Sequence, residues 1–126
     1  MANILNSLRR LFKHRQHKRY FVTRGTFVVI SSGKVDGRDR EVQIIDISQG
    51  GMAFIYQGSP AELAAFDILK PHGTNIEFDT VSDISFSDST QTSEPSRRRS
   101  VKFKWMGFYE QEELKDFINE IKTCEK

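Results

Sequence analysis

The chain has 126 residues, of which 37% are hydrophobic and 11% aromatic, and this composition fits one small folded domain rather than two. Its one cysteine, Cys124, excludes an intrachain disulfide framework and a cysteine-ligated zinc site, and it indicates a reducing, cytoplasmic location. The net charge is only +2, and no apolar run reaches the roughly 18 residues that a membrane-spanning helix needs, so neither a transmembrane segment nor a secretory signal is expected.

The charges are unevenly distributed along the chain. Eight Lys or Arg residues precede the first acidic residue, Asp36, whereas the 91 residues from Asp36 onward carry 11 basic and 17 acidic groups. A basic arm on a mildly acidic body indicates an anionic partner that meets the N-terminal part of the chain. A phosphate group is the obvious candidate, in a nucleotide, a nucleic acid or a lipid.

Taken in chain order, the spacing of apolar residues predicts a short amphipathic helix over residues 4–12, within an N-terminal arm of residues 1–13. Residues 14–19 are wholly polar and predict a loop. Runs of aromatic and β-branched residues, separated by turn signals, then predict six strands. These strands are expected over residues 20–30, 40–48, 52–57, 66–69, 74–86 and 97–108.

The C-terminal part predicts how the strands are covered. In the last strand Val101, Phe103 and Trp105 alternate with lysines, so these three side chains are expected to point inward. Residues 109–123 predict an amphipathic helix whose apolar face packs on them, with Phe117 buried. The expected fold is therefore mainly β: a six-stranded antiparallel β-barrel over residues 20–108, closed by a C-terminal helix and preceded by the short N-terminal helix or arm.

Residue patterns typical of enzymes are absent from the sequence. His14 and His17 have metal-like spacing, but no Cys, Asp or Glu lies nearby in sequence to complete a site. No nucleophile elbow surrounds Ser48, and no glycine-rich loop ends in Lys-Ser or Lys-Thr. We therefore expect a binding protein with no metal and no cofactor.

One candidate binding pattern is the pair Arg15 and Arg19, four residues apart in the polar loop. A guanidinium presents hydrogen-bond donors in a planar fork, which suits a phosphate and also the O6/N7 edge of guanine. With ten arginines in the chain, this spacing is expected by chance roughly once, so a solvated basic linker is the alternative interpretation.

The second pattern is Asp46-Ile-Ser48-Gln-Gly-Gly51, where one predicted strand turns into the next. An ionised Asp46 accepts two hydrogen bonds side by side, which matches guanine N1–H and N2–H₂, and Ser48 can donate or accept. Gly51 permits a positive φ and lets a ligand or another chain segment approach the backbone. The alternative is an Asx-type turn without a ligand.

Arg15-x-x-x-Arg19, followed by Asp46-x-Ser48-x-x-Gly51 on a β-barrel pattern, resembles the PilZ-domain family of bacterial receptors for cyclic diguanylate (c-di-GMP). The resemblance extends over residues 14–122 and implies a domain of residues 14–126. It also implies that Arg15 and Arg19 contact phosphates and guanine edges, while Asp46 and Ser48 fix a guanine. A single receptor domain of this kind would act through a protein partner that the sequence does not identify.

Three further arginines, Arg97, Arg98 and Arg99, precede the core of the last strand. Arg98 is the candidate for an additional ligand contact, and the alternative is that the three offset the acidic start of the helix.

Two other functions fit parts of the sequence. A single-stranded nucleic-acid-binding barrel would stack bases on Phe21, Phe27 and Phe54, but the net acidic barrel disfavours it. A membrane-surface adaptor would use residues 4–19 as a basic anchor.

Overall fold

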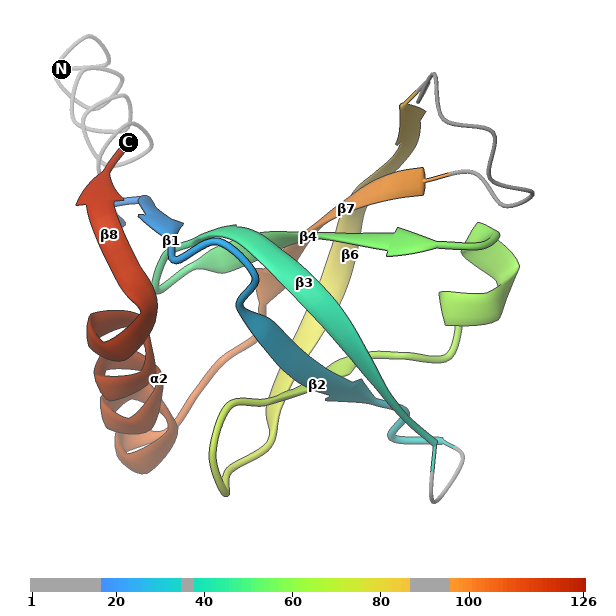
Figure 1. Ribbon diagram of the computed structural model, residues 1–126. Helices are drawn as coiled ribbons and strands as arrows, with labels where there is room; N and C mark the ends of the chain where they lie inside the picture. Colours follow the sequence, from blue (N-terminus) through green and yellow to red (C-terminus); the bar gives the residue numbers. More distant parts are fainter. Residues whose placement is uncertain (1–16, 35–37, 87–95) are drawn as a thin grey trace, which may run out of the picture.

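The computed structural model describes residues 17–34, 38–86 and 96–126, and Figure 1 shows its ribbon. The described part consists mainly of strands, with one α-helix near the C-terminus. The helix expected over residues 4–12 and the candidate ligand residue Arg15 lie outside the described residues.

Six antiparallel strands close into a barrel, as the sequence predicted. Their order is β2-β5-β6-β7-β4-β3, and pairing between β2 and β3 closes the ring. The strands are β2 (Phe27–Ser31), β3 (Asp39–Ile47), β4 (Gly51–Gln57), β5 (Ile68–Lys70), β6 (Ile76–Phe86) and β7 (Ser96–Phe103). Closure leaves the ring itself without an unpaired edge.

The core lies inside the barrel and under the helix α2 (Phe108–Ile121). Inward residues of the strands, among them Val42 and Phe54, join the helix residues Leu114, Phe117 and Ile118 in one buried apolar cluster. Phe117 is 6% exposed, which confirms its predicted burial. The apolar face of α2 thus fixes the helix beside the barrel (Figure 1).

The single strand expected over residues 20–30 is two strands. β1 (Tyr20–Val22) ends before a turn in which Gly25 has a φ of +81°, and β2 begins only at Phe27. The left-handed backbone conformation of Gly25 makes a turn that separates β1 from β2. β1 leaves the barrel and pairs with the end of β3, so that Tyr20 lies opposite Ile47.

The helix predicted to reach residue 123 ends at Ile121 and is followed by a strand that the sequence analysis missed. β8 (Lys122–Glu125) pairs antiparallel with β1, so that Phe21 lies opposite Cys124. All four residues of β8 are exposed, and the strand lies at the end of the sheet. The pairing places the last residue, Lys126, beside residues 17–19, where the Lys126 N–H donates to the Arg19 carbonyl at 2.9 Å.

The predicted inward position of Trp105 is wrong. β7 ends at Phe103, so the strand alternation that buries Val101 and Phe103 stops before Trp105. The indole lies in the connection to α2 and is 89% exposed. Phe103 alone of the two aromatic residues packs in the core.

A short 3₁₀ helix, η1 (Pro60–Leu63), begins at Pro60, whose fixed φ suits the first position of a helix. Ser59 precedes it but makes no side-chain capping bond. The Glu62 carboxylate lies 3.5 Å from the Arg40 guanidinium of β3, so η1 is tied to the barrel wall instead.

Candidate functional site

A cavity of about 780 Å³ opens on the outer face of the barrel, beside the ends of β1 and β8. It brings together four stretches that are far apart in sequence. They are residues 17–19, the β3–β4 turn, the outer faces of β6 and β7, and the C-terminal residues 125–126. Of the six predicted ligand residues, Arg19, Asp46, Ser48 and Gly51 line this cavity.

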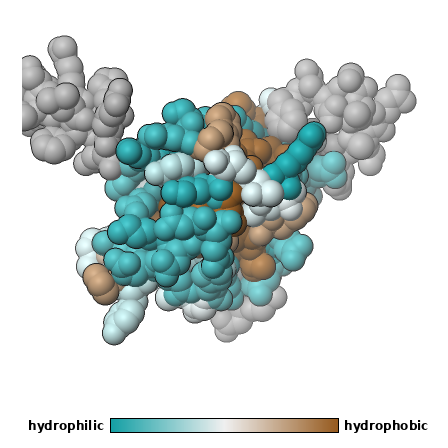
Figure 2. All heavy atoms as spheres, turned by 60° about the vertical axis from the view of Figure 1, so that its left-hand side comes forward, coloured by the Kyte–Doolittle hydropathy of each residue, from teal (hydrophilic) through white to brown (hydrophobic). Residues whose placement is uncertain are grey.

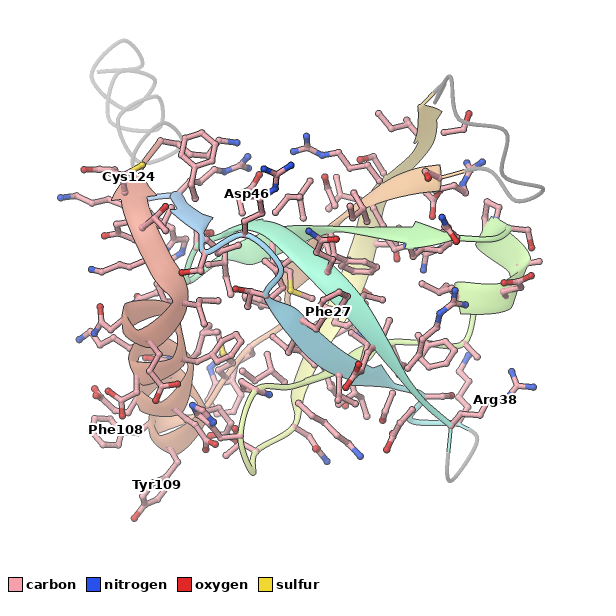
Figure 3. All side chains as sticks on the ribbon, in the orientation of Figure 1. Phe27, Arg38, Asp46, Phe108, Tyr109 and Cys124 are labelled. Carbon is pink, nitrogen blue, oxygen red and sulfur yellow. The ribbon has the colours of Figure 1, made fainter. Side chains whose placement is uncertain are left out.

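A bulge in β3 turns Asp46 toward the cavity. Strict alternation would place Ile44 and Asp46 on the inner face and Ile47 on the outer face. Instead the β3–β4 register shifts between Ile44 and Asp46, so Ile44 and Ile47 are both buried in the core and Asp46 points outward (Figure 3). The strand thus supplies an acidic side chain on a rigid element.

The Asp46 carboxylate is only 7% exposed and already has two cationic partners. The Arg98 guanidinium donates to Oδ2 at 3.3 Å, and the Lys126 ammonium donates to the same oxygen at 3.0 Å. Within the described part of the chain, Oδ1 has no hydrogen-bond partner. The carboxylate is therefore compensated for its burial and still offers one oxygen.

Ser48 organises the turn that follows Asp46. Its hydroxyl oxygen accepts from the N–H groups of Gly50 and Gly51, at 3.1 and 3.2 Å, and its O–H donates to the Gly51 carbonyl at 3.3 Å. The Ser48 N–H donates to the same carbonyl at 2.8 Å. One donor and two acceptor positions are thus used within the turn, which holds the cavity wall in shape.

Gly51 is required by a close approach of β7. A Cβ at this position would lie 2.2 Å from the Val101 carbonyl oxygen, well inside van der Waals contact. Gly51 has no positive φ. The left-handed conformation that a glycine would permit here is therefore not adopted. Another chain segment, rather than a ligand, occupies the space that the missing side chain leaves.

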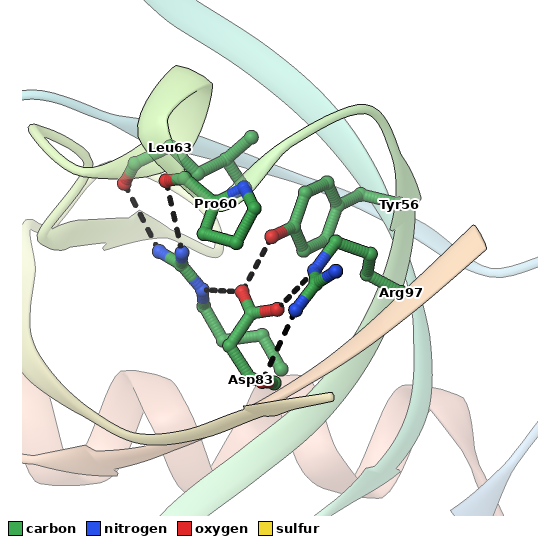
Figure 4. A network of polar contacts seen from close by, with 6 residues as sticks. Tyr56, Pro60, Leu63, Asp83 and Arg97 are labelled. Atoms are coloured by element: carbon green, nitrogen blue, oxygen red, sulfur yellow. Dashed lines mark hydrogen bonds and ion pairs between the residues drawn. The ribbon is translucent and has the colours of Figure 1, made fainter. Parts of the chain in front are cut away.

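The three arginines at the start of β7 divide between two sites because strand side chains alternate. Arg98 points outward to Asp46, where it is 40% exposed. Arg97 and Arg99 point to the other side and bind Asp83 of β6, at 2.5 and 2.8 Å (Figure 4). Neither of these two pairs with the start of α2, so that alternative interpretation is wrong for them.

Asp83 is the centre of a structural network away from the cavity. The Tyr56 hydroxyl and both guanidinium groups donate to its carboxylate, and Arg99 also donates to the carbonyls of Leu63 and Pro60 in η1 (Figure 4). Burial alone would raise the pKa of Asp83, but the hydrogen bonds from Tyr56 and the arginines hold it below its ordinary value. Burial, and then the bond to Asp83, raises the pKa of Tyr56. The network ties η1 to the barrel.

Sequence reasoning missed two lysines that line the cavity, Lys102 and Lys126. Lys102 lies opposite Gly51 in the β4–β7 pair, and Lys126 reaches the cavity only because β8 pairs with β1. The alternation of lysines in the last predicted strand was the available signal for Lys102. No pattern in the nearby sequence predicts that Lys126 lies at the cavity, because its position depends on the pairing of β8 with β1, which is far away in sequence.

The described residues do not support two other sites. No cluster of three or more His, Cys, Asp or Glu that could hold a metal ion occurs among them. Phe54, one of the three base-stacking platforms in the nucleic-acid-binding alternative, is fully buried in the core and cannot stack on a base, whereas Phe21 and Phe27 are exposed. Within the described ranges, no helix is both long and apolar enough to span a bilayer.

Comparison with solved structures shows that the described fold is PilZ-like. The PilZ domain of YcgR from Escherichia coli, solved with c-di-GMP, matches with a TM-score of 0.62 and 17% identity, over 85% of this chain and 90% of that one. The K. pneumonia MrkH–c-di-GMP complex matches with a TM-score of 0.60 and 20% identity, over 84% of this chain and 51% of MrkH. This chain thus spans about half the length of MrkH. Neither a family model nor a curated protein sequence matches it.

Proposed function

We propose that this PilZ-like domain is a c-di-GMP receptor and that the ligand binds in the 780 Å³ cavity beside Asp46. One observation carries the proposal: the fold brings Arg19 and the Asp46–Gly51 turn, 27 residues apart in sequence, to the same cavity. Two proteins solved with c-di-GMP have this fold. The volume lies within the usual range for small-molecule sites.

The charges of the cavity wall suit a ligand with two phosphates and two guanines. Four cations, Lys18, Arg19, Lys102 and Lys126, line it against the two carboxylates of Asp46 and Glu125. The cations attract the phosphates, whereas a carboxylate repels them. Asp46 therefore faces a base edge, where N1–H and N2–H₂ of guanine donate to its two oxygens.

Binding in this way changes the present contacts of Asp46. Its Oδ2 now accepts from Lys126 and Arg98, so a guanine edge competes for that oxygen. Lys126 lines the cavity, so its ammonium can leave this oxygen and turn to a phosphate of the ligand. Arg98 remains beside the base as the additional contact that the sequence analysis proposed.

Arg15 and Ser48 complete the proposed site in different ways. The resemblance to PilZ domains implies that Arg15, like Arg19, contacts phosphates and guanine edges. The Ser48 hydroxyl can bind guanine only by giving up a bond within its turn, so we assign it first to positioning Asp46 and the glycines.

Isothermal titration calorimetry with c-di-GMP, and with GTP as the control ligand, tests the proposal. Arg19→Ala and Asp46→Ala are each expected to weaken binding at least about tenfold, which corresponds to one charge-assisted hydrogen bond. Arg24→Ala and Asp116→Ala are matched controls, because both residues are exposed and neither lines the cavity. No heat with c-di-GMP, or equal binding of GTP, would overturn the proposed function.

A further inference from the structure

Three large aromatic side chains are exposed around the start of α2. Trp105 is 89% exposed, Phe108 72% and Tyr109 80%. We call these three residues the aromatic patch. Figure 3 shows Phe108 and Tyr109 projecting from the end of α2 that lies away from Asp46, so the patch is not part of the ligand cavity.

The backbone that carries the patch is fixed on the domain. The Gln111 N–H donates to the Gly107 carbonyl and the Gln111 amide donates to the Met106 carbonyl, both at 3.0 Å. Met106 itself packs against the core. The Phe108 and Tyr109 rings meet edge to face, with their centroids 6.1 Å apart. The rings are therefore displayed by an ordered connection and an ordered helix.

The three rings can be covered together by one partner. Trp105 and Tyr109 are four residues apart, so their Cα atoms lie within about 14 Å of each other. A buried aromatic side chain contributes about 150–250 Å², and three of them make a patch of several hundred square ångströms. Exposed apolar patches of that size mark interaction sites, and Trp and Tyr are frequent hot-spot residues.

The charge beside the patch indicates the chemistry of the partner. Helix α2 carries five acidic residues and a single basic residue, Lys115. Glu112, Asp116 and Glu120 are exposed, and hydrophilic side chains cover most of the face that Figure 2 brings forward. An acidic surface repels nucleic acids and anionic membranes, and it attracts lysine- and arginine-rich protein segments.

We propose that the aromatic patch and the acidic face of α2 together form a docking surface for a protein segment rich in Lys and Arg that also carries aliphatic or aromatic side chains. The apolar side chains of that segment cover Trp105, Phe108 and Tyr109, and its cations meet Glu112 and Asp116. This surface is separate from the cavity, so it does not depend on the ligand proposed above.

Selection from a random peptide library displayed on phage, with the intact chain as bait, tests this surface. The enriched peptides are expected to be basic and to contain apolar residues. The affinity of a synthetic enriched peptide is then measured by fluorescence polarisation. The triple variant Trp105→Ser, Phe108→Ser, Tyr109→Ser and the charge reversal Glu112→Lys, Asp116→Lys should each weaken binding at least about tenfold.

Phe27→Ser is the matched control, because Phe27 is a 56% exposed aromatic residue on β2, and it should bind the peptide as the wild type does. Thermal unfolding of the triple variant should match the wild type, since the three rings are exposed. No enrichment, enrichment of acidic or uncharged peptides, or an equal loss in Phe27→Ser would overturn the proposal. So would dimerisation, or binding of phosphatidylglycerol vesicles, that the triple variant abolishes, because the occupant would then be a second copy or a membrane.

Discussion

Replacing Gly51 by alanine separates the two roles that the sequence allowed for this glycine. The added Cβ would lie 2.2 Å from the Val101 carbonyl oxygen, whereas ordinary contact begins near 3.4 Å, so the two strands must separate by about 1 Å. Both atoms are held by strand backbones, and the neighbouring bond from the Phe103 N–H to the Gly50 carbonyl, 2.9 Å long, is strained with them. Overpacking of this kind costs about 3 kcal/mol, the upper end of its usual range.

Urea denaturation measures this cost as a lower midpoint at an unchanged slope. Gly73→Ala is the matched control, because the nearest atom to its added Cβ, on Glu113, lies 3.9 Å away and the residue has no positive φ. Its midpoint should stay close to that of the wild type. If Gly51→Ala unfolds with the wild-type midpoint but no longer binds c-di-GMP, the reasoning from strand packing is refuted and the glycine serves ligand approach.

Three further predictions follow from single contacts. Lys126→Ala should make c-di-GMP binding less dependent on salt, because one cation fewer lines the cavity, whereas Lys122→Ala should not; equal salt slopes for both variants would contradict this. Asp83→Asn should destabilise the fold by about 3 kcal/mol at pH 7, since it leaves the buried Arg99 and the half-buried Arg97 without their charge partner. The pKa of Asp83 is lowered in the folded state, so the carboxylate contributes to the free energy of unfolding above the ordinary carboxyl pKa and loses this contribution as the pH falls through the folded-state pKa. The denaturation midpoints of wild type and variant should therefore converge below about pH 4. Phe117→Ala should cost about 3–5 kcal/mol by the same assay, and a smaller change than 1 kcal/mol would show that the helix is not anchored through this ring.

The barrel and its helix were predictable because their signals are local. Alternating apolar residues define strands such as β3 and β4 within a few residues, and the helical spacing of Leu114, Phe117 and Ile118 defines the buried face of α2. The Asp46–Gly51 turn was also visible, since it is a short polar segment between two such strands. Its detailed roles were not, because the Val101 carbonyl that excludes a side chain at Gly51 comes from a strand 50 residues later.

Features that depend on pairing or on interruption of a pattern were missed. The inward position of Trp105 assumed that the alternation of β7 continues past Phe103, but the chain leaves the sheet there. The grouping of Arg97 with Arg98 ignored that neighbouring strand residues face opposite sides. The bulge that redirects Asp46 leaves one weak sign in the sequence. Ile44 and Ile47 are both apolar, although strict alternation would place residues three positions apart on opposite faces of the strand.

The site is built from parts of unequal stability. Asp46 and its turn belong to the closed barrel, where β3 and β4 are paired on both sides. Three of the four cations that line the cavity, Lys18, Arg19 and Lys126, are held through β1, a strand of three residues, and through β8, whose four residues are all exposed, whereas Lys102 belongs to β7 of the barrel. Short exposed strands at a sheet end gain little from burial, so their order depends on few contacts. One of these contacts is the bond from Lys126 to Asp46. We expect a ligand that takes this oxygen and offers phosphates to the cations to change the order of β1 and β8 without disturbing the barrel.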